Sequence, residues 1–415
     1  MLHTFFAKAR RFVIVAVGAL VAVASPAEEP WLEKTDLFAA RDAGFALPRI
    51  PGIVVTKRGV VLAYCEARKN SGADWGEIEV HLRRSIDGGR TWGPARQIAH
   101  VGPRLPRNPV ALAKRAGGPD DQTVNNPVAI AAADGTVHFL YCVEYARCFY
   151  LRSDDDGATF SAPVEITSAF EKFRPEYAWQ VLATGPGHGI QLKNGRLLVT
   201  VWLSTGEHGH SPSVAATIFS DDRGATWAAG EIALPDAGEL KTPNETTAVQ
   251  LADGRVMLNA RSNSAASRRL VTTSADGATG WMTAWFDPAL AEPICMGSLL
   301  RLTGSPGGGW LLFANPDSLK RDEQGAEVPG GRGERRNLSL KLSRDSGKTW
   351  PVNQVLEAGA SAYSDLGQLA DGTLLCFYER TNGLMDNGKP RGVLTLARFN
   401  IDWLTSSSPD VPQAR

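Results

Sequence analysis

The chain lacks a net charge. Its 415 residues include 44 basic and 44 acidic side chains, and charged residues make up only 21% of the composition. Because neither sign is in excess, the overall charge does not point to nucleic acid or to an anionic membrane surface as a partner. An anionic ligand would have to be held by a local cluster of positive side chains.

Cysteine is scarce and shows no metal-binding spacing. The five cysteines are an odd number and contain no Cys-x-x-Cys pair, so we expect neither a zinc site nor any other metal or cofactor. Cys65 and Cys376 lie in apolar, strand-like runs, where a buried free thiol is expected. The sequence leaves open whether Cys142 pairs with Cys148, and whether a loop holds a structural calcium.

No apolar run is long enough to span a bilayer comfortably, since this needs roughly 20 residues. The run FVIVAVGALVAV (12–23) follows basic residues and precedes small ones. This pattern predicts a secretory signal peptide over residues 1–27, cleaved after Ala24 or Ala27. An uncleaved anchor is the alternative. We therefore expect a secreted or periplasmic protein with no membrane span in the mature chain.

One octapeptide occurs four times. Its copies are SIDGGRTW from Ser85, SDDDGATF from Ser153, SDDRGATW from Ser220 and SRDSGKTW from Ser343. The shared Asp can accept backbone N–H groups within a turn, and the shared Gly can adopt a positive φ. Alternating flanks such as EIEVHLRR indicate strands. Each copy, an Asp-box, is therefore predicted to be a β-hairpin turn whose closing aromatic ring packs between strands.

The copies recur at a regular spacing. The first two steps are 68 and 67 residues, and the third, of 123, is close to two steps and contains a worn copy, SADGATGW, from Ser274. A fixed period of antiparallel units is typical of a β-propeller. With a period of about 65 residues, the sequence predicts an all-β fold with six blades over 28–405 and a short tail over 406–415. A twin β-sandwich explains the period less well.

Candidate functional residues lie outside the repeats, because such turns occur in propellers of unrelated function. Four stretches place charged or tyrosine side chains beside strand-like segments. Taken singly, each such residue has an ordinary explanation as a solvated or packing group. They are Arg49; Glu66, Arg68 and Asp74; Glu245 and Arg261; and Arg335, Arg336, Tyr363, Asp365 and Glu379.

In this order the stretches resemble the exo-sialidases with Asp-box repeats. The matching motifs are Arg-Ile-Pro, Glu-x-Arg followed by Asp, Asn-Glu-Thr with Asn-Ala-Arg-Ser, Arg-x-Asn-Leu-Ser and Ser-Ala-Tyr-Ser-Asp-Leu. The resemblance covers essentially all of the mature chain. It implies a six-bladed propeller that removes terminal sialic acids from glycoproteins, glycolipids or oligosaccharides, with retention of configuration through a tyrosyl-enzyme intermediate.

The resemblance also implies catalytic roles. Tyr363 matches the nucleophile, Glu245 its base, and Asp74 the general acid/base. A tyrosine suits this substrate, because a carboxylate nucleophile would be repelled by the carboxylate on the anomeric carbon. A phenol with a pKa near 10 needs a base, and nearby arginines are expected to favour the phenolate. We expect the pKa of Asp74 to lie above its usual value of about 4, raised by burial or by the charge of the substrate.

Substrate binding is implied for a second set of residues. Arg49, Arg261 and Arg335 match the three arginines that clamp the substrate carboxylate, although a slip of one place would exchange Arg335 for Arg336. Relatives often have Tyr near the position of Trp202, which leaves the contacts to the glycerol chain open. The remaining matches are Arg68 to the ring substituents, Glu379 as the partner of Arg49, and, more loosely, Asn126 and Trp202 near the sugar.

Other functions remain open at this stage. The same fold could act on another nonulosonic acid, transfer rather than hydrolyse, or bind sialic acid without turnover. The presence of Asp74, Glu245 and Tyr363 argues against binding alone, because a pure binder needs only the arginines. His188 and His210 are interpreted as structural, since no partner histidine accompanies them. We expect a monomer that does not bind nucleic acid, and linkage preference stays open.

Overall fold

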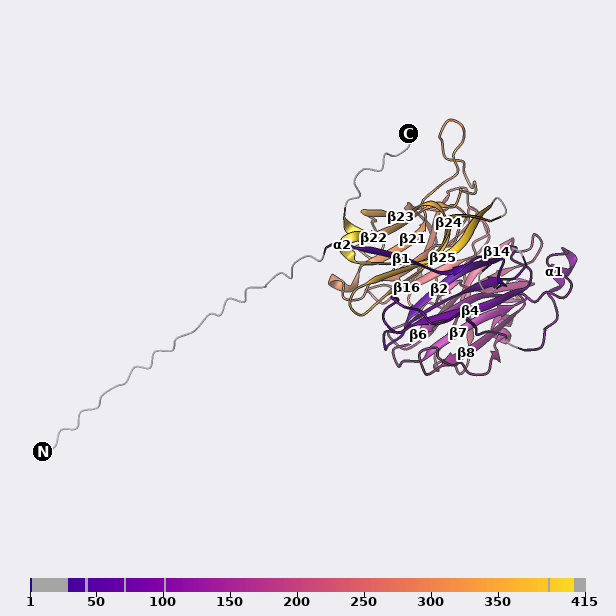
Figure 1. Ribbon diagram of the computed structural model, residues 1–415, viewed down its shortest axis with the longest axis horizontal. Helices are drawn as coiled ribbons and strands as arrows, with labels where there is room; N and C mark the ends of the chain where they lie inside the picture. Colours follow the sequence, from indigo (N-terminus) through magenta and orange to yellow (C-terminus); the bar gives the residue numbers. More distant parts are fainter. Residues whose placement is uncertain (2–28, 42–43, 71, 101, 387–388, 407–415) are drawn as a thin grey trace.

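The computed structural model describes Met1 and residues 29–406, apart from 42–43, 71, 101 and 387–388. The predicted signal peptide after Met1 and all but the first residue of the predicted tail therefore lie outside the described residues. Within the described part, no helix is long and apolar enough to cross a membrane. The regular secondary structure there consists mainly of β-strands (Figure 1).

Four sheets of four or five strands and one of seven make up the described fold. The first sheet contains β2 (Leu47–Val55), β3 (Val61–Arg68), β4 (Ile78–Ser85) and β5 (Arg96–Gln97). The second contains β6 (Val124–Ala131), β7 (Val137–Val143), β8 (Arg147–Ser153) and β9 (Val164–Glu165), with β11 (Gly187–His188) parallel to β6. The third contains β10 (Val181–Thr184), β12 (Ile190–Gln191), β13 (Leu197–Ser204), β14 (Ser213–Ser220) and β15 (Ala228–Leu234).

The fourth and fifth sheets complete the ring. The fourth contains β16 (Thr246–Gln250), β17 (Val256–Ala260), β18 (Arg268–Ser274) and β19 (Trp285–Ala291). The fifth contains β20 (Ser298–Arg301), β21 (Leu311–Pro316), β22 (Arg336–Ser343), β23 (Val352–Gln368), β24 (Leu374–Asp386), β25 (Lys389–Phe399) and β1 (Leu32–Ala39). The short helices are α1 (Pro109–Ala113), α2 (Ile401–Thr405), η2 (Thr167–Phe173) and η3 (Pro306–Gly308).

The all-β, propeller-like fold agrees with the sequence prediction. The strands nearest the centre, β2, β6, β12, β16, β20 and the end of β23, surround one central cavity. In Figure 1, β6, β7 and β8 lie in the lower part of the view, and β21, β22, β23 and β24 lie in the upper part. The sheet count alone does not give the blade number, because β22 and β24 both pair with the long β23.

Apolar side chains fill the spaces between neighbouring sheets rather than one central core. Leu62 and Tyr64 of the first sheet, for example, pack on Phe139 of the second, with the Tyr64 and Phe139 rings 5.2 Å apart and edge-on. All three are fully buried, and burial of each such side chain contributes about 1.5–3 kcal/mol. The five cysteines are also buried and free; Cys142 lies directly opposite Cys148 without a disulfide.

The N-terminal strand closes the ring. Strand β1 pairs antiparallel with β25 from Leu32 opposite Phe399 to Ala39 opposite Val393. Residues separated by more than 350 positions in sequence are thereby fixed in register. The chain that follows β1 enters β2 beside the seven-stranded sheet, which brings the start of β2 close to β24.

Glutamine side chains fasten neighbouring inner strands to one another. Gln191, Gln250 and Gln368 each precede a Leu and a tight turn containing Gly. The Oε1 atom of Gln191 accepts from the backbone N–H of Ala133 at 2.8 Å, and that of Gln250 from Lys193 at 2.9 Å. Gln368 accepts from Thr303 in the same way at 2.7 Å. These repeated bonds satisfy backbone donors that the ladders leave unpaired.

The Asp-box turns have the predicted geometry. In the copy from Ser220, Asp222 Oδ1 accepts from the N–H of Thr226 at 2.9 Å, and Ser220 Oγ accepts from the N–H of Gly224 at 2.8 Å. Gly224 has a φ of 85°. The worn copy makes the equivalent hydrogen bond, in which Asp276 Oδ1 accepts from the N–H of Thr279 at 2.8 Å. The closing rings are only half-buried.

These turns predict an acid-sensitive contribution to stability. Hydrogen bonds from Thr226 lower the pKa of Asp222 to about 2, against about 3.9 in an unfolded chain. A lowered folded pKa stabilises the fold above about pH 4, and this contribution is lost as the pH falls towards about 2. Asp222→Asn should lower the free energy of unfolding at neutral pH, and its difference from the wild type should shrink in acid.

Urea unfolding followed by tryptophan fluorescence across this pH range measures the effect. Asp120→Asn, at an exposed position outside the turns, serves as the matched control and should leave the pH profile unchanged. A difference between Asp222→Asn and wild type that stayed constant down to about pH 2 would contradict the assignment.

Candidate active site

The predicted site residues converge at one end of the sheets. Strand register places Arg49 of β2 opposite Glu66 of β3, near the end where β3 stops at Arg68. The Asp-box serine Ser85 instead pairs with Val61, at the opposite end of β3. The Asp-box turn therefore lies away from the candidate site, because the antiparallel pairing of β3 and β4 puts Ser85 and Arg68 at opposite ends of these strands.

Arg49 is held by a carboxylate from a distant strand. Its Nε and Nη2 atoms donate to Glu379 of β24 at 3.0 and 3.2 Å. Glu379 also accepts from the backbone N–H of Ile50 at 3.0 Å. Burial alone would raise the pKa of Glu379, but Arg49 outweighs it and lowers that pKa. The pair thus fixes a charged guanidinium whose Cζ lies 5.1 Å from the centre of the Tyr363 ring.

Tyr363, Glu245 and Arg261 form a connected triad. The Tyr363 hydroxyl donates to Glu245 Oε1 at 2.5 Å, and Arg261 Nη1 donates to Glu245 Oε2 at 2.5 Å and to the Tyr363 oxygen at 2.8 Å. Glu245 precedes β16 and Arg261 follows β17, and backbone bonds place them opposite each other. A hairpin therefore presents the acid and the arginine together to a tyrosine from β23.

Tyr363 is a neutral phenol in this arrangement. Burial, followed by the charge of Glu245, raises the pKa of Tyr363 far above its ordinary value. Arg261 and Arg335 lower it, as the sequence analysis expected, but they do not compensate. The expectation that the arginines favour the phenolate is confirmed in direction, but desolvation and Glu245 act more strongly, so the pKa of Tyr363 is still raised.

Arg335, not Arg336, belongs to the cluster. The Nη2 of Arg335 donates to the carbonyl of Ile294 at 2.7 Å, and its Cζ lies 5.3 Å from the centre of the Tyr363 ring. Arg336 is 58% exposed and faces Glu334 at 3.5 Å. The backbone of Arg335 has a φ of 43° just before β22 begins, so adjacent residues point in different directions.

The arginine cluster has spare positive charge and spare donors. Arg49 and Arg261 pair with Glu379 and Glu245, and the Asp74 carboxylate lies 4.0 Å from Arg49. Arg335 has no carboxylate partner among the described residues and bonds only to a backbone carbonyl. The Nε atoms of Arg261 and Arg335 are buried and find no hydrogen-bond partner among the described residues. Buried donors without partners are costly unless a ligand accepts from them. The cluster therefore suits a monoanion such as a carboxylate.

Asp74 faces the cluster from the loop after β3. Its Oδ1 lies 2.9 Å from Arg68 Nη1 and 4.0 Å from Arg49 Nη1, and the side chain is 48% exposed. Burial would raise the pKa of Asp74, but Arg68, His210 and Arg49 together lower it to about 2. The expected rise through burial is therefore wrong, because the nearby positive charges, that of Arg68 first, outweigh the burial.

Glu66 lies beneath this arrangement, and the sequence predicts no role for it. Its Oε2 accepts from Arg68 Nη2 at 2.8 Å, and both side chains are almost completely buried. Asn126, predicted near the sugar, instead supports Glu66: its N–H donates to Glu66 Oε1 at 2.9 Å. The Asn126 side chain bonds to Thr184 and Asn125 within the fold.

Trp202 lies in an aromatic cluster behind Asp74. The cluster also contains Trp75, Tyr145 and His210, with ring centres 4.6–6.0 Å apart. Trp202 Nε1 and His210 Nε2 are buried without a described partner. The sequence predicts a structural role for His210 and none for Trp75 or Tyr145. Trp75 follows Asp74 directly, which was the available signal.

The comparisons with known proteins agree with this geometry. Residues 107–376 match the BNR repeat-like domain family. The chain is 30% identical to a sialidase of Micromonospora viridifaciens over 93% of its own length and 58% of the relative. It is 30% identical to a sialidase of Bacteroides fragilis over 82% of its own length and 61% of the relative. The chain thus spans about three fifths of these two relatives.

Solved structures give the same result. The chain superposes on a Hadza microbial sialidase with a TM-score of 0.70 and 26% identity, covering 88% of this chain and 68% of the other. An intramolecular trans-sialidase from Ruminococcus gnavus shares the fold, with a TM-score of 0.68 and 18% identity over 89% and 98% of the two chains. With the family match spanning well over half of its residues, the chain belongs to the BNR repeat-like domain family.

Proposed function

We propose that the protein is an exo-α-sialidase that hydrolyses terminal sialic acids of glycoconjugates. The observation that carries this proposal is the Tyr363 hydroxyl, which donates to Glu245 at 2.5 Å beside three guanidinium groups. A tyrosine with an adjacent base is suited to attack an anomeric centre that already bears a carboxylate. The relatives named as sialidases support the same conclusion.

The arginine cluster binds the substrate carboxylate in this mechanism. Arg49, already fixed by Glu379, presents its remaining donor, and Arg261 and Arg335 offer their unpartnered Nε groups. Planar guanidinium groups can each form parallel bonds to a carboxylate, which a lysine could not imitate. The carboxylate thereby holds the anomeric carbon above the Tyr363 hydroxyl.

Bond formation and proton transfer are coupled in the first step. The Tyr363 oxygen attacks the anomeric carbon while its proton passes to Glu245 Oε1, so no free phenolate is required. The glycosidic bond breaks, and the leaving oxygen takes a proton from Asp74. In the second step Asp74 takes a proton from water, the water oxygen replaces the tyrosine, and Glu245 returns the proton to Tyr363. Two displacements retain the configuration.

Substrate binding supplies the condition that Asp74 needs to act as an acid. The charges of Arg68, His210 and Arg49 hold the pKa of Asp74 at about 2. A substrate carboxylate on Arg49 offsets part of this positive charge, and the sugar excludes water, so the pKa of Asp74 rises in the complex. The 48% exposure of this side chain leaves a path for water and supports hydrolysis over transfer.

We also propose that the five sheets form six propeller blades. Strand β23 pairs with β22 from Val352 to Ala360 and with β24 from Ser361 to Gln368. The seven-stranded sheet then divides into two blades that share this strand, and the four smaller sheets supply the rest. The basic and apolar pattern before position 28 supports secretion or periplasmic export. We also propose that the protein is a monomer.

Removal of the Tyr363 hydroxyl tests the nucleophile. Tyr363→Phe should lower kcat by roughly 10³-fold or more, because no other group can form the covalent intermediate. Binding of free N-acetylneuraminate should stay close to wild type, because the guanidinium groups remain. Release of 4-methylumbelliferone from its N-acetylneuraminic acid glycoside measures kcat, and calorimetry measures binding. A variant with the wild-type rate would remove Tyr363 from the mechanism.

The identity of the leaving group tests the general acid. Asp74→Asn should slow sialyllactose cleavage by roughly 10²–10⁴-fold, because the sugar oxygen needs a proton. The aryl glycoside should suffer much less in its first step, because its leaving group is already stable as an anion. Pre-steady-state bursts separate this step from the second. Equal losses of the first-step rate on both substrates would exclude Asp74 as the acid.

Adjacent arginines provide a matched pair for the carboxylate site. Arg335→Ala should raise KM about 10- to 100-fold through loss of charge-assisted bonds. Arg336→Ala should change KM little, because this side chain faces Glu334 in solvent. Melting temperatures of the two variants control for folding. A larger effect at Arg336 would reverse the assignment.

A further inference from the structure

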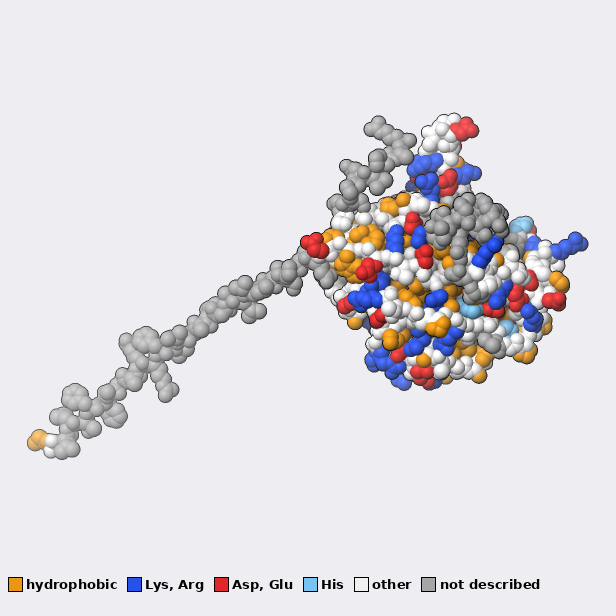
Figure 2. Space-filling model, in the orientation of Figure 1, with side chains coloured by type: hydrophobic (Ala, Val, Ile, Leu, Met, Phe, Trp, Pro, Cys, Tyr) orange, Lys and Arg blue, Asp and Glu red, His pale blue; other side chains and the backbone are white. Residues whose placement is uncertain are grey.

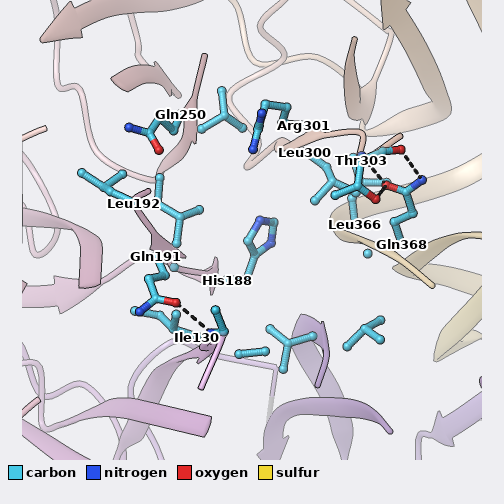
Figure 3. A pocket seen from close by; sticks show the side chains of 18 of the residues that line it. Ile130, His188, Gln191, Leu192, Gln250, Leu300, Arg301, Thr303, Leu366 and Gln368 are labelled. Atoms are coloured by element: carbon cyan, nitrogen blue, oxygen red, sulfur yellow. Dashed lines mark hydrogen bonds between the residues drawn. The ribbon is translucent and has the colours of Figure 1, made fainter. Parts of the chain in front are cut away.

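The central cavity described above lies at the end of the sheets away from the candidate active site. It has a volume of about 550 Å³ and is lined by the ends of the inner strands (Figure 3). Leu366, Gly367 and Gln368 line it, three to five residues beyond Tyr363 on β23. At about 3.3 Å per residue, this places the cavity roughly 10–17 Å from the tyrosine. The cavity is therefore separate from the arginine cluster.

The charged side chains that line this cavity are all basic. They are His188, Lys193 and Arg301, and no Asp or Glu is among the described residues of the lining. For Lys193 and Arg301, no carboxylate of the described chain lies within ion-pair distance. Figure 3 shows the Arg301 guanidinium and the His188 ring pointing into the same space. In contrast, two of the three clustered arginines at the candidate active site have carboxylate partners.

His188 is held rigidly at the floor of the cavity. Its side chain is only 8% exposed, and Nδ1 lies 2.7 Å from Asp365 Oδ1. Asp365 is itself fixed by Ser298 Oγ at 2.9 Å and by the N–H of Ile53 at 2.9 Å. With Nδ1 bound to Asp365, the other nitrogen of the ring is the one available to the cavity. Burial lowers the pKa of His188, but Asp365 outweighs it and raises that pKa, which favours a donor at Nε2.

The polar amides around the cavity are already engaged. Gln191, Gln250 and Gln368 use their carbonyl oxygens on backbone donors of the neighbouring strand. Their amide nitrogens donate to Gly195, Gly254 and Thr303. They therefore form a fixed frame, and the free hydrogen-bonding capacity of the cavity is that of donors.

We propose that this cavity binds a small oxyanion-bearing molecule, with Arg301 and His188 as its hydrogen-bond donors and Lys193 supplying further positive charge. A guanidinium with no carboxylate partner is matched to a carboxylate or a phosphate. The volume accommodates a molecule of monosaccharide size, such as a sugar acid or a sugar phosphate. This site does not depend on the proposed sialidase activity.

Calorimetric titration at low ionic strength tests the site, because salt screens such contacts. Inorganic phosphate is the first probe and gluconate, a sugar carboxylate, the second. Wild type should bind phosphate at two places, the arginine cluster and this cavity. Arg301→Gln should weaken one of them about tenfold or more, and His188→Asn should weaken the same one. Neither variant should change kcat/KM for the aryl glycoside.

Two variants serve as controls. Arg152→Gln removes an equal charge from an exposed residue that already pairs with Asp154, and it should leave both binding events intact. Arg335→Ala should weaken only the other event. The proposal is overturned if the sole phosphate binding is lost in Arg335→Ala and kept in Arg301→Gln. Stronger binding of gluconate than of phosphate would identify the ligand as a carboxylate, and the reverse as a phosphate.

Discussion

Three guanidinium groups held around one buried tyrosine are the constraint on which the candidate site depends. Like charges repel, and burial makes this repulsion more costly. Glu379 and Glu245 offset two of the three charges, and each makes more than one bond: Glu379 also caps the backbone of Ile50, and Glu245 also accepts from Tyr363. Arg335 has no carboxylate partner among the described residues, so a bound anion can offset its charge. The two glutamates thus stabilise the cluster and leave Arg335 available to a ligand.

Ring closure makes this arrangement possible. Arg49 and Glu379 are 330 positions apart, yet they meet because β1 joins β25 and so places β2 beside β24.

The surface of the protein carries no dominant charge on the face seen in Figure 2, where acidic and basic side chains are interspersed. An anion would therefore be attracted by the local cluster rather than by the whole protein, which agrees with the balanced composition.

The two ends of the sheets hold different groups of residues, structural turns at one end and the candidate site at the other. The Asp-box turns and the glutamine bonds lie at the end away from Tyr363, where they fix the hairpins and fasten one inner strand to the next. Strand β23 connects both ends, because Tyr363 belongs to the triad and Asp365, two residues later on the same face, anchors His188, Ser298 and β2. The position of the tyrosine is therefore tied to the packing of the channel beneath it.

The sequence by itself determined what depends on near neighbours and on the order of motifs. The Asp-box bonds join residues two to four positions apart, so an octapeptide was sufficient to predict them, and the period predicted an all-β, propeller-like fold. The order of motifs carried the resemblance that implied Tyr363 and Glu245 as a pair and Arg261 as a carboxylate ligand, and the structure joins the three in one triad. Only the tertiary structure showed that Arg335 and not Arg336 belongs to the cluster. It also showed that Asn126 and Trp202 are buried behind the site, and that the charges around Asp74 lower its pKa. These outcomes depend on burial and on charges brought together from distant strands, neither of which a local pattern contains.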